Sequence, residues 1–240
     1  MTIDSHKFSD IGGREENQDA LGMKIDGENG IFVVADGLGG HRNGRLASDC
    51  AVSTLLTNWD PASEEPPEDM LRDGISKANQ AILTIQQKES CNARSTVVAL
   101  MIRGETAVWA HSGDSRLYWL HDGGIAAVTE DHSVAYKKYQ AGEITKEEIA
   151  ADEDQSSLLR TLGGVTRWEP EVSRTETLSP EDAFLLCSDG VWEYVRDDEI
   201  LVDYLKAGSA REWAVLLLLR LSARIPKDND NLSLITVMLK

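Results

Sequence analysis

The sequence is poor in cysteine, in long apolar runs and in basic residues. It has three cysteines in 240 residues, and neither their odd number nor their spacing suits a disulfide framework or a zinc knuckle. Its longest apolar patch, residues 213–221, is interrupted by Arg220 and is shorter than the roughly 20 residues that span a bilayer. Residues 1–10 lack the basic-then-apolar pattern of a secretory signal. We therefore expect a protein without a membrane span, located in the reducing cytoplasm.

The scarcity of basic residues gives the chain a strongly negative charge. It has 24 Lys and Arg against 41 Asp and Glu, a net charge of −17 at pH 7. Such a surface repels phosphate backbones and anionic lipids, which disfavours nucleic acids and membranes as partners. No glycine-rich phosphate loop of the Walker or dinucleotide type is present in the sequence. A negative charge of this size is compatible with cations as ligands.

The predicted strands and helices occur in groups and do not alternate one by one. Apolar patterns predict strands at residues 20–25, 30–35, 96–102, 107–112, 116–120, 171–178, 183–187 and 232–239, and helices at 47–59, 68–87, 133–140, 145–151, 197–206 and 210–223. This grouping favours an α+β fold with antiparallel sheets and external helices, in a single domain over residues 1–240. Residues 136–157 are highly charged, and we interpret them as a mobile excursion from the core.

Four aspartates lie at the ends of predicted strands. Asp36 and Asp189 each follow an apolar run and precede a glycine, Asp114 follows the run that ends at residue 112, and Asp230 precedes the last strand. Carboxylates at strand ends, with the carbonyl oxygens that a following glycine exposes, are ligands that hard divalent cations prefer. Each Asp-Gly pair is also compatible with a simple turn. The absence of a closely spaced Cys/His set disfavours structural zinc.

A polar run at residues 14–19 begins with Arg14 and is rich in carboxylates. Arg14 is compatible with a surface salt bridge. Its planar guanidinium also matches the oxygens of a phosphate group. An arginine beside an oxygen-rich cation site would suit a phosphate ester as substrate, because the cations neutralise phosphate charge and acidify a water nucleophile.

These residues belong to motifs that resemble one known family, the metal-dependent protein phosphatases of the protein phosphatase 2C type, and in particular its compact bacterial serine/threonine phosphatases. The matching segments are REENQD (14–19), VVADGLGGH (33–41), ST (95–96), GDSR (113–116), TEDHS (129–133), RTLG (160–163), LCSDGVW (186–192) and DNLS (230–233). They follow the order of the family across nearly the whole chain, which makes a chance similarity very improbable.

The resemblance implies a four-layer α-β-β-α sandwich, with two antiparallel sheets flanked by helix pairs and a small flap at about residues 136–157. It also implies the site residues. They are Asp36, which bridges two Mn²⁺ or Mg²⁺ ions, the Gly37 carbonyl as a backbone ligand, Asp189 and Asp230 as further direct ligands, Asp19 as a holder of metal-bound water, Asp114 as a ligand of a third, weaker metal, and Arg14 as the phosphate-binding residue.

The chain departs from the family pattern at three places. Gln18 stands where many members have Glu, which predicts weaker metal binding with activity retained. Leu38 stands where eukaryotic relatives carry a proposed general acid, and His41 or a metal-bound water is the alternative proton donor. The acidic run at 152–157 replaces a basic stretch of the flap, so the family's substrate preference does not carry over.

The resemblance implies hydrolysis of phosphoserine and phosphothreonine in proteins by a metal-bridging hydroxide. The expected partners are phosphorylated proteins and a bacterial Ser/Thr kinase whose action the enzyme reverses, and the expected oligomeric state is a monomer. Because the surface is acidic, we expect a preference for basic flanking residues. The alternatives are a non-catalytic module that binds phosphoproteins, and hydrolysis of small phosphate metabolites by the same chemistry.

Overall fold

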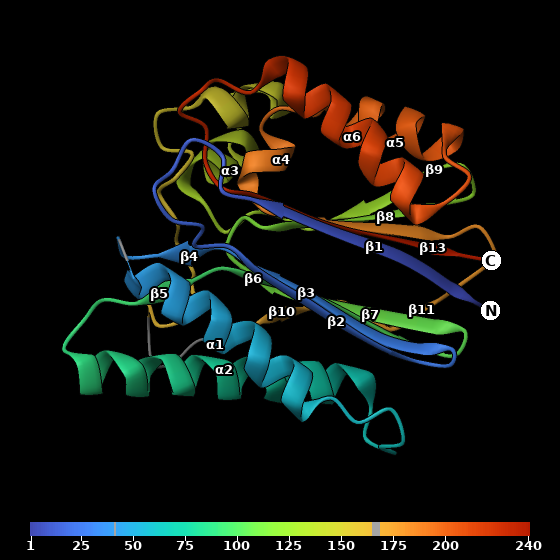
Figure 1. Ribbon diagram of the computed structural model, residues 1–240, viewed down its shortest axis with the longest axis horizontal. Coiled ribbons are helices and arrows are strands. Elements are labelled where there is room, and N and C mark those ends of the chain that lie inside the picture. The colour runs from blue at the N-terminus through green and yellow to red at the C-terminus, as the bar shows by residue number, and fades with distance from the viewer. Residues whose placement is uncertain (41, 165–168) are drawn as a thin grey trace.

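The computed structural model describes residues 1–40, 42–164 and 169–240 and consists of two antiparallel sheets packed face to face between helices (Figure 1). One sheet has the order β1(Ile3–Asp10), β13(Leu232–Leu239), β12(Ala183–Cys187), β8(Arg116–His121) and β9(Gly124–Val128). The other has the order β10(Glu171–Val172), β7(Thr106–Ser112), β6(Val97–Arg103), β3(Asn29–Ala35) and β2(Ala20–Asp26), with β11(Glu176–Thr177) also paired to β7. The short strands β4(Gly37–Leu38) and β5(Arg94–Ser95) pair at one end.

The central strands are apolar on both faces because both faces are covered. In β3, Phe32 and Val34 pack between the sheets, whereas Ile31 and Val33 pack toward the helices. All four side chains are at most 1% exposed. This double burial explains why the predicted strand at 30–35 is a continuous apolar run and not an alternating one.

Helix pairs cover the two outer faces, so the α+β class and the four-layer sandwich are confirmed. Helices α1(Arg42–Asn58) and α2(Pro67–Glu89) lie on the sheet that contains β3, and α5(Asp197–Lys206) and α6(Ala210–Arg224) lie on the sheet that contains β13 (Figure 1). The short helix α4(Asp189–Trp192) directly follows β12. Helix α1 begins before the predicted residue 47, and α2 has proline at its first position, where a missing N–H costs nothing.

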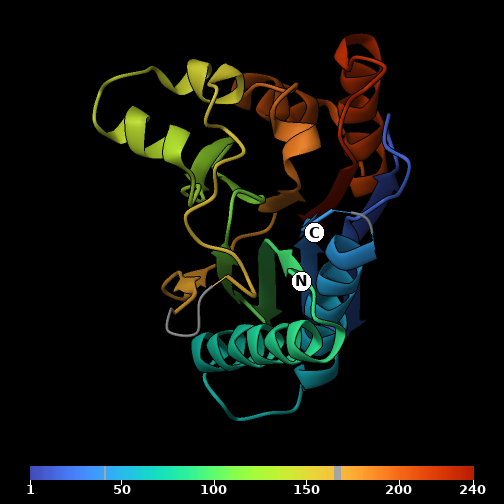
Figure 2. The same ribbon diagram turned by 90° about the vertical axis from the view of Figure 1, so that its left-hand side faces the viewer.

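The flap, residues 136–157, contains most of α3(Val134–Gln140) and the 3₁₀ helix η1(Lys146–Ala151), and it projects from the sandwich beside α4 and α5 (Figure 2). It packs onto the core, since Ile149 is 1% exposed within the apolar cluster beneath α5 and α6. Lys138 forms ion pairs with Asp152 and Asp154, at 2.9 and 2.8 Å. Two carboxylates of the acidic run are therefore neutralised locally, and the mobility of the flap stays a prediction.

The structure contains elements that the sequence pattern did not predict. Strand β1 is polar and half-exposed because it lies at a sheet edge, and β9 is half-buried at the opposite edge. The predicted strand at 171–178 was wrong as a continuous element. It is divided into β10 and β11, and between them the Ser173 hydroxyl and backbone N–H bond the backbone of Trp109.

Two further expectations can be compared with the described residues. None of the described helices is both long enough and apolar enough to cross a bilayer. Cys50, Cys91 and Cys187 are free thiols, of which Cys187 is buried and the other two are half-buried.

A histidine–aspartate pair closes the end of the sandwich away from β4. The Asp182 carboxylate is 1% exposed and accepts hydrogen bonds from His121 Nδ1 at 2.7 Å, from Trp119 Nε1 at 3.3 Å and from the Ser179 backbone N–H at 3.0 Å. The hydrogen bond to Asp182 raises the pKa of His121. A raised native pKa stabilises the fold fully below the unfolded value of about 6.5, and this stabilisation disappears as pH rises through the native pKa.

We predict that His121→Gln lowers the melting temperature by about 1–2 °C at pH 6 and by less at pH 8.5, as expected for a partly exposed ion pair. Thermal unfolding of both proteins at the two pH values measures the difference. His6→Gln on β1 is the control, because His6 forms no ion pair with the described residues. An equal loss at both pH values would contradict the assignment.

Candidate functional site

The five predicted aspartates come together at the end of the sandwich that carries β4 and α4, opposite the chain termini (Figure 1). Asp19 directly precedes β2, Asp36 follows β3, Asp189 begins α4 after β12, and Asp230 precedes β13. Asp114 lies in the turn between β7 and β8. Neighbouring antiparallel strands begin and end at the same end of a sheet, so residues from distant parts of the sequence meet here.

Buried hydroxyl groups link Asp36 to Asp114. The Asp36 backbone N–H donates to Thr96 Oγ1 at 2.9 Å, and this hydroxyl bonds Ser115 Oγ at 2.7 Å. Ser115 adjoins Asp114, whose backbone carbonyl accepts from Trp192 Nε1 at 2.9 Å. Thr96 and Ser115 are at most 1% exposed, so the two carboxylate-bearing turns are fixed relative to each other.

The other three aspartates are joined through the pairing of β12 and β13. Ser188 N–H donates to the Ser233 carbonyl at 3.0 Å, and Ser188 Oγ donates to Asp19 Oδ2 at 2.8 Å. A Cβ atom added at Gly190 would lie 2.2 Å from the Asn231 carbonyl oxygen. Only glycine permits this approach, which brings the residue after Asp189 against the residue after Asp230.

Burial and mutual repulsion disfavour full ionisation of this cluster. Burial raises the pKa of Asp36 well above its usual range, and Asp189, Asp19, Asp114 and Asp230 raise it further. Asp189 shows the same effect, from burial first and then from Asp114 and other carboxylates. Burial also raises the pKa of Asp19 to about 6 and that of Asp114 to about 7. A cluster that resists its own negative charge would be stabilised by a bound cation.

Two further observations indicate that the residues of the aspartate cluster fit divalent cations. Asp19 Oδ1 is buried and has no hydrogen-bond partner among the described residues, so it is an acceptor available to a metal-bound water. A Cβ atom at Gly44 in α1 would lie 2.6 Å from the Gly37 carbonyl oxygen and 2.2 Å from Gln18 Oε1. The absence of a side chain at Gly44 lets α1 pack directly against this carbonyl. The donors gathered here are oxygens, as Mn²⁺ and Mg²⁺ prefer.

Arg14 contacts this cluster as a salt bridge, one of the two interpretations that the sequence allowed. Its Nε and Nη2 atoms donate to the two Asp230 carboxylate oxygens at 3.0 and 2.7 Å. The hydrogen bond to Asp230 raises the pKa of Arg14, which is therefore cationic. Its side chain is 54% exposed, so the guanidinium lies at the open side of the cluster.

The fold gathers one group of possible ligand atoms that spacing along the sequence does not indicate. Folding brings ligand atoms of His111, His132 and Glu171 within 4.8 Å of one another, although the residues are far apart in sequence. The two imidazole rings are stacked, with centroids 4.6 Å apart and planes 9° apart. A histidine binds a cation through a lone pair in its ring plane, so rings stacked in this way do not converge on one ion. His132 also bonds Glu171 at 3.1 Å.

One acidic residue at the site was missed from the sequence. Glu193 lies one turn after Asp189, and burial first and Asp230 second raise its pKa to about 7. The spacing of four residues from Asp189 at a helix start would have indicated it. Of the departures from the family pattern, Gln18 donates its backbone N–H to Asn231 Oδ1, Leu38 is half-buried in β4, and His41 lies outside the described residues.

The raised pKa values predict how metal-free protein responds to pH. Asp19 and Asp114 keep their protons in the native state up to about pH 6 and 7, whereas the unfolded chain releases them near pH 4. Stability in EDTA should therefore fall between pH 5 and pH 8, and Mn²⁺ should raise the melting temperature by several degrees more at pH 8. Differential scanning fluorimetry measures both effects. Asp114→Asn should flatten the pH dependence, and a metal-free protein that gains stability toward pH 8 would contradict the prediction.

Comparison with known proteins identifies the family. A family model described as Protein phosphatase 2C matches residues 9–215. A serine/threonine phosphatase of Listeria welshimeri is 34% identical over 209 residues, 84% of this chain and 79% of the relative. The crystal structure of the Mycobacterium tuberculosis serine/threonine phosphatase PstP/Ppp superposes with a TM-score of 0.88 at 27% identity, over 100% of both chains. A structure of the PstP catalytic domain in complex with two manganese ions has a TM-score of 0.85 at 26% identity, over 99% of this chain and 98% of that one. This chain belongs to the protein phosphatase 2C family.

Proposed function

We propose that the aspartate cluster is the catalytic centre of a metal-dependent phosphatase for phosphoserine and phosphothreonine in proteins. The supporting observation is the convergence of five half-buried or buried aspartates beside the Arg14 guanidinium, which bonds Asp230, together with the raised pKa values of Asp19, Asp36, Asp114 and Asp189. The chain is a serine/threonine protein phosphatase by family, and its relatives are named as such.

In this proposal Asp36, Asp189, Asp230 and the Gly37 carbonyl hold two Mn²⁺ or Mg²⁺ ions directly. Asp19 would hold a metal-bound water through Oδ1, which has no partner among the described residues, and Asp114 would belong to a third, weaker site. When bound, the cations neutralise phosphate charge and lower the pKa of water, so that a nucleophile forms near neutral pH.

Arg14 has the complementary task of holding the phosphate. The bidentate contact with Asp230 keeps the guanidinium extended over the carboxylates. Two phosphate oxygens offer the same bidentate acceptor geometry as a carboxylate. Arg14 would turn from Asp230 to the substrate phosphate when the charge of Asp230 is offset, since both groups are bidentate acceptors.

The proposal extends to the cellular setting. Phosphorylated proteins are the substrates of serine/threonine phosphatases, and we infer an opposing Ser/Thr kinase. Free thiols at all three cysteines support a cytoplasmic location. We further propose that residues 1–240 form one catalytic domain, which acts as a monomer.

The role of Asp189 is tested by Asp189→Asn, which keeps the shape of the side chain and removes its charge. We expect a loss of kcat/KM toward a phosphothreonine peptide of about a hundredfold or more, and a similar loss for the wild type in EDTA. Asp73→Asn on the exposed face of α2 is the matched control and should keep full activity. Asp189→Asn with most of its Mn²⁺-dependent activity would refute the assignment.

The role of Arg14 is tested by separating substrate binding from metal binding. Arg14→Ala should raise KM for a phosphopeptide by about tenfold, because a charge-assisted bidentate contact is lost. Mn²⁺ affinity, measured by calorimetry, should stay equal or increase, since Arg14 no longer competes for Asp230. A loss of Mn²⁺ binding with unchanged KM would show that Arg14 supports the carboxylates instead.

A further inference from the structure

A cleft beside the aspartate cluster carries an inference about substrate choice, which rests on the proposed function. The cleft has a volume of about 740 Å³ and lies between η1 of the flap and the segment that runs from α4 into α5. Glu193 lines it and interacts electrostatically with Asp230 and Arg14. Glu193 directly follows α4, the helix that Asp189 begins, so the cleft lies beside the proposed phosphate site, and a chain that places its phosphate there can extend toward the cleft.

The walls suit a peptide better than a small ionic ligand. Trp192, Val195 and Ile149 are buried beneath the floor of the cleft, Ala150 is half-buried beside them, and the Arg116 guanidinium lies 3.6 Å from the centre of the Trp192 ring. Most of the other lining residues are charged, so a bound segment meets both apolar and charged groups, as a side chain with an apolar stem and a charged end requires. One wall belongs to the flap, which is held to α5 by the ion pair of Lys146 with Asp197 at 2.6 Å.

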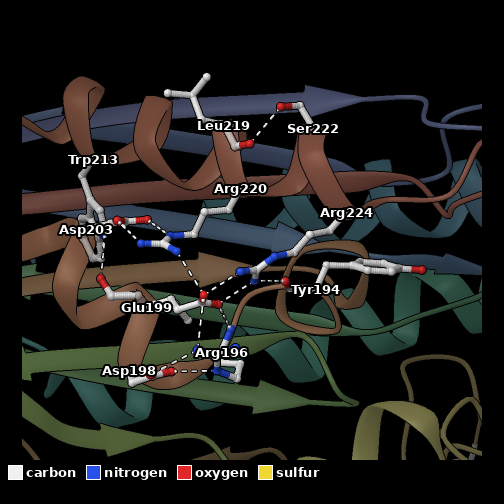
Figure 3. Close-up of polar contacts among 11 residues, drawn as sticks. Tyr194, Arg196, Asp198, Glu199, Asp203, Trp213, Leu219, Arg220, Ser222 and Arg224 are labelled. Carbon is white, nitrogen blue, oxygen red and sulfur yellow. Dashed lines mark hydrogen bonds and ion pairs between the residues drawn. The ribbon is translucent and has the colours of Figure 1, made fainter.

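The basic side chains that line the cleft already form ion pairs within the protein. Arg116 forms a bidentate ion pair with Asp131, at 2.8 and 2.7 Å. On the α5 and α6 side, Arg196 and Arg224 both turn toward Glu199, as Figure 3 shows. Arg196 also contacts Asp198, and Arg220 joins the same network through Glu199 and Asp203 (Figure 3). These positive charges are therefore neutralised within the protein and do not offer a site for an anion.

Two acidic side chains in the cleft have no such compensation. Glu147 and Glu193 form no side-chain hydrogen bond or ion pair within residues 1–40, 42–164 and 169–240. Glu147 is exposed in the first turn of η1. The flap carboxylates Asp152 and Asp154 are already paired with Lys138, whereas Glu147 is exposed and unpaired among the described residues, so the free negative charge that faces a bound peptide is concentrated at Glu147.

We propose that this cleft binds the segment of a phosphoprotein that flanks the phosphorylated residue, and that Glu147 selects segments carrying Lys or Arg. The apolar walls accommodate the stem of the basic side chain, and the carboxylate pairs with its charged end. The selectivity that the net charge of −17 suggests would thus arise at one position and not from the whole surface.

The test is an arginine scan along a phosphothreonine peptide, with alanine and glutamate as alternatives at each position. We expect the wild type with Mn²⁺ to prefer arginine over alanine at one or two positions by about three- to tenfold in kcat/KM at low salt, and less at high salt. Glu147→Gln should reduce this ratio toward one, and Glu147→Lys should invert it. Glu143→Gln, on the flap outside the cleft, changes the net charge equally and should keep the wild-type ratio.

An unchanged ratio in both Glu147 variants, an equal reduction in Glu143→Gln, or a wild-type preference for glutamate would overturn the inference while leaving the proposed function intact. Circular dichroism of the variants confirms that they are folded. Failure of the folded wild type to hydrolyse every peptide with Mn²⁺ would overturn the proposed function, and the inference with it.

Discussion

The electrostatic cost of holding five carboxylates together at one end of a sandwich governs the structure. Each of Asp36 and Asp189 is penalised by burial and again by the other aspartates, so no local preference would gather them. The two sheets supply the constraint, because apolar packing between them fixes the strand ends where the aspartates lie. Hydroxyl groups at Thr96, Ser115 and Ser188 then hold the turns without adding charge. The fold thus concentrates negative charge at one end, which bound cations would neutralise.

The same separation of charge extends beyond the cluster. Near the cluster, basic side chains are neutralised by ion pairs. Arg116 pairs with Asp131, Arg224 pairs with Glu199, and Lys138 pairs with two flap carboxylates. Arg14 differs because its acceptor, Asp230, is itself a proposed metal ligand. In the proposed site, a substrate phosphate would therefore meet an arginine whose partner can be replaced, in a protein that is otherwise strongly anionic.

The sequence predicted the elements whose patterns arise from burial and missed those that arise from tertiary contact. The runs that became β3 and β12 are buried on both faces, so their apolar character and their terminal aspartates were visible in advance. Strand β1 is polar because an edge strand buries little, and no periodicity indicated it. Glu193 was missed because α4 is a single turn. The juxtaposition of His111 with His132 depends on how two distant segments pack, which spacing along the chain does not encode.

The antiparallel pairing of β1 with β13 joins the two ends of the chain, where Thr2 and Lys240 exchange backbone hydrogen bonds of 2.7 and 3.0 Å. These ends lie across the sandwich from the aspartates (Figure 1). Strand β1 covers the outer edge of β13. Without β1, β13 would be an apolar edge strand with unpaired backbone N–H and C=O groups, to which a strand of another molecule could add. A fusion partner attached at either end would therefore leave the aspartate cluster accessible. Deletion of β1 would instead expose the edge of β13 and favour aggregation.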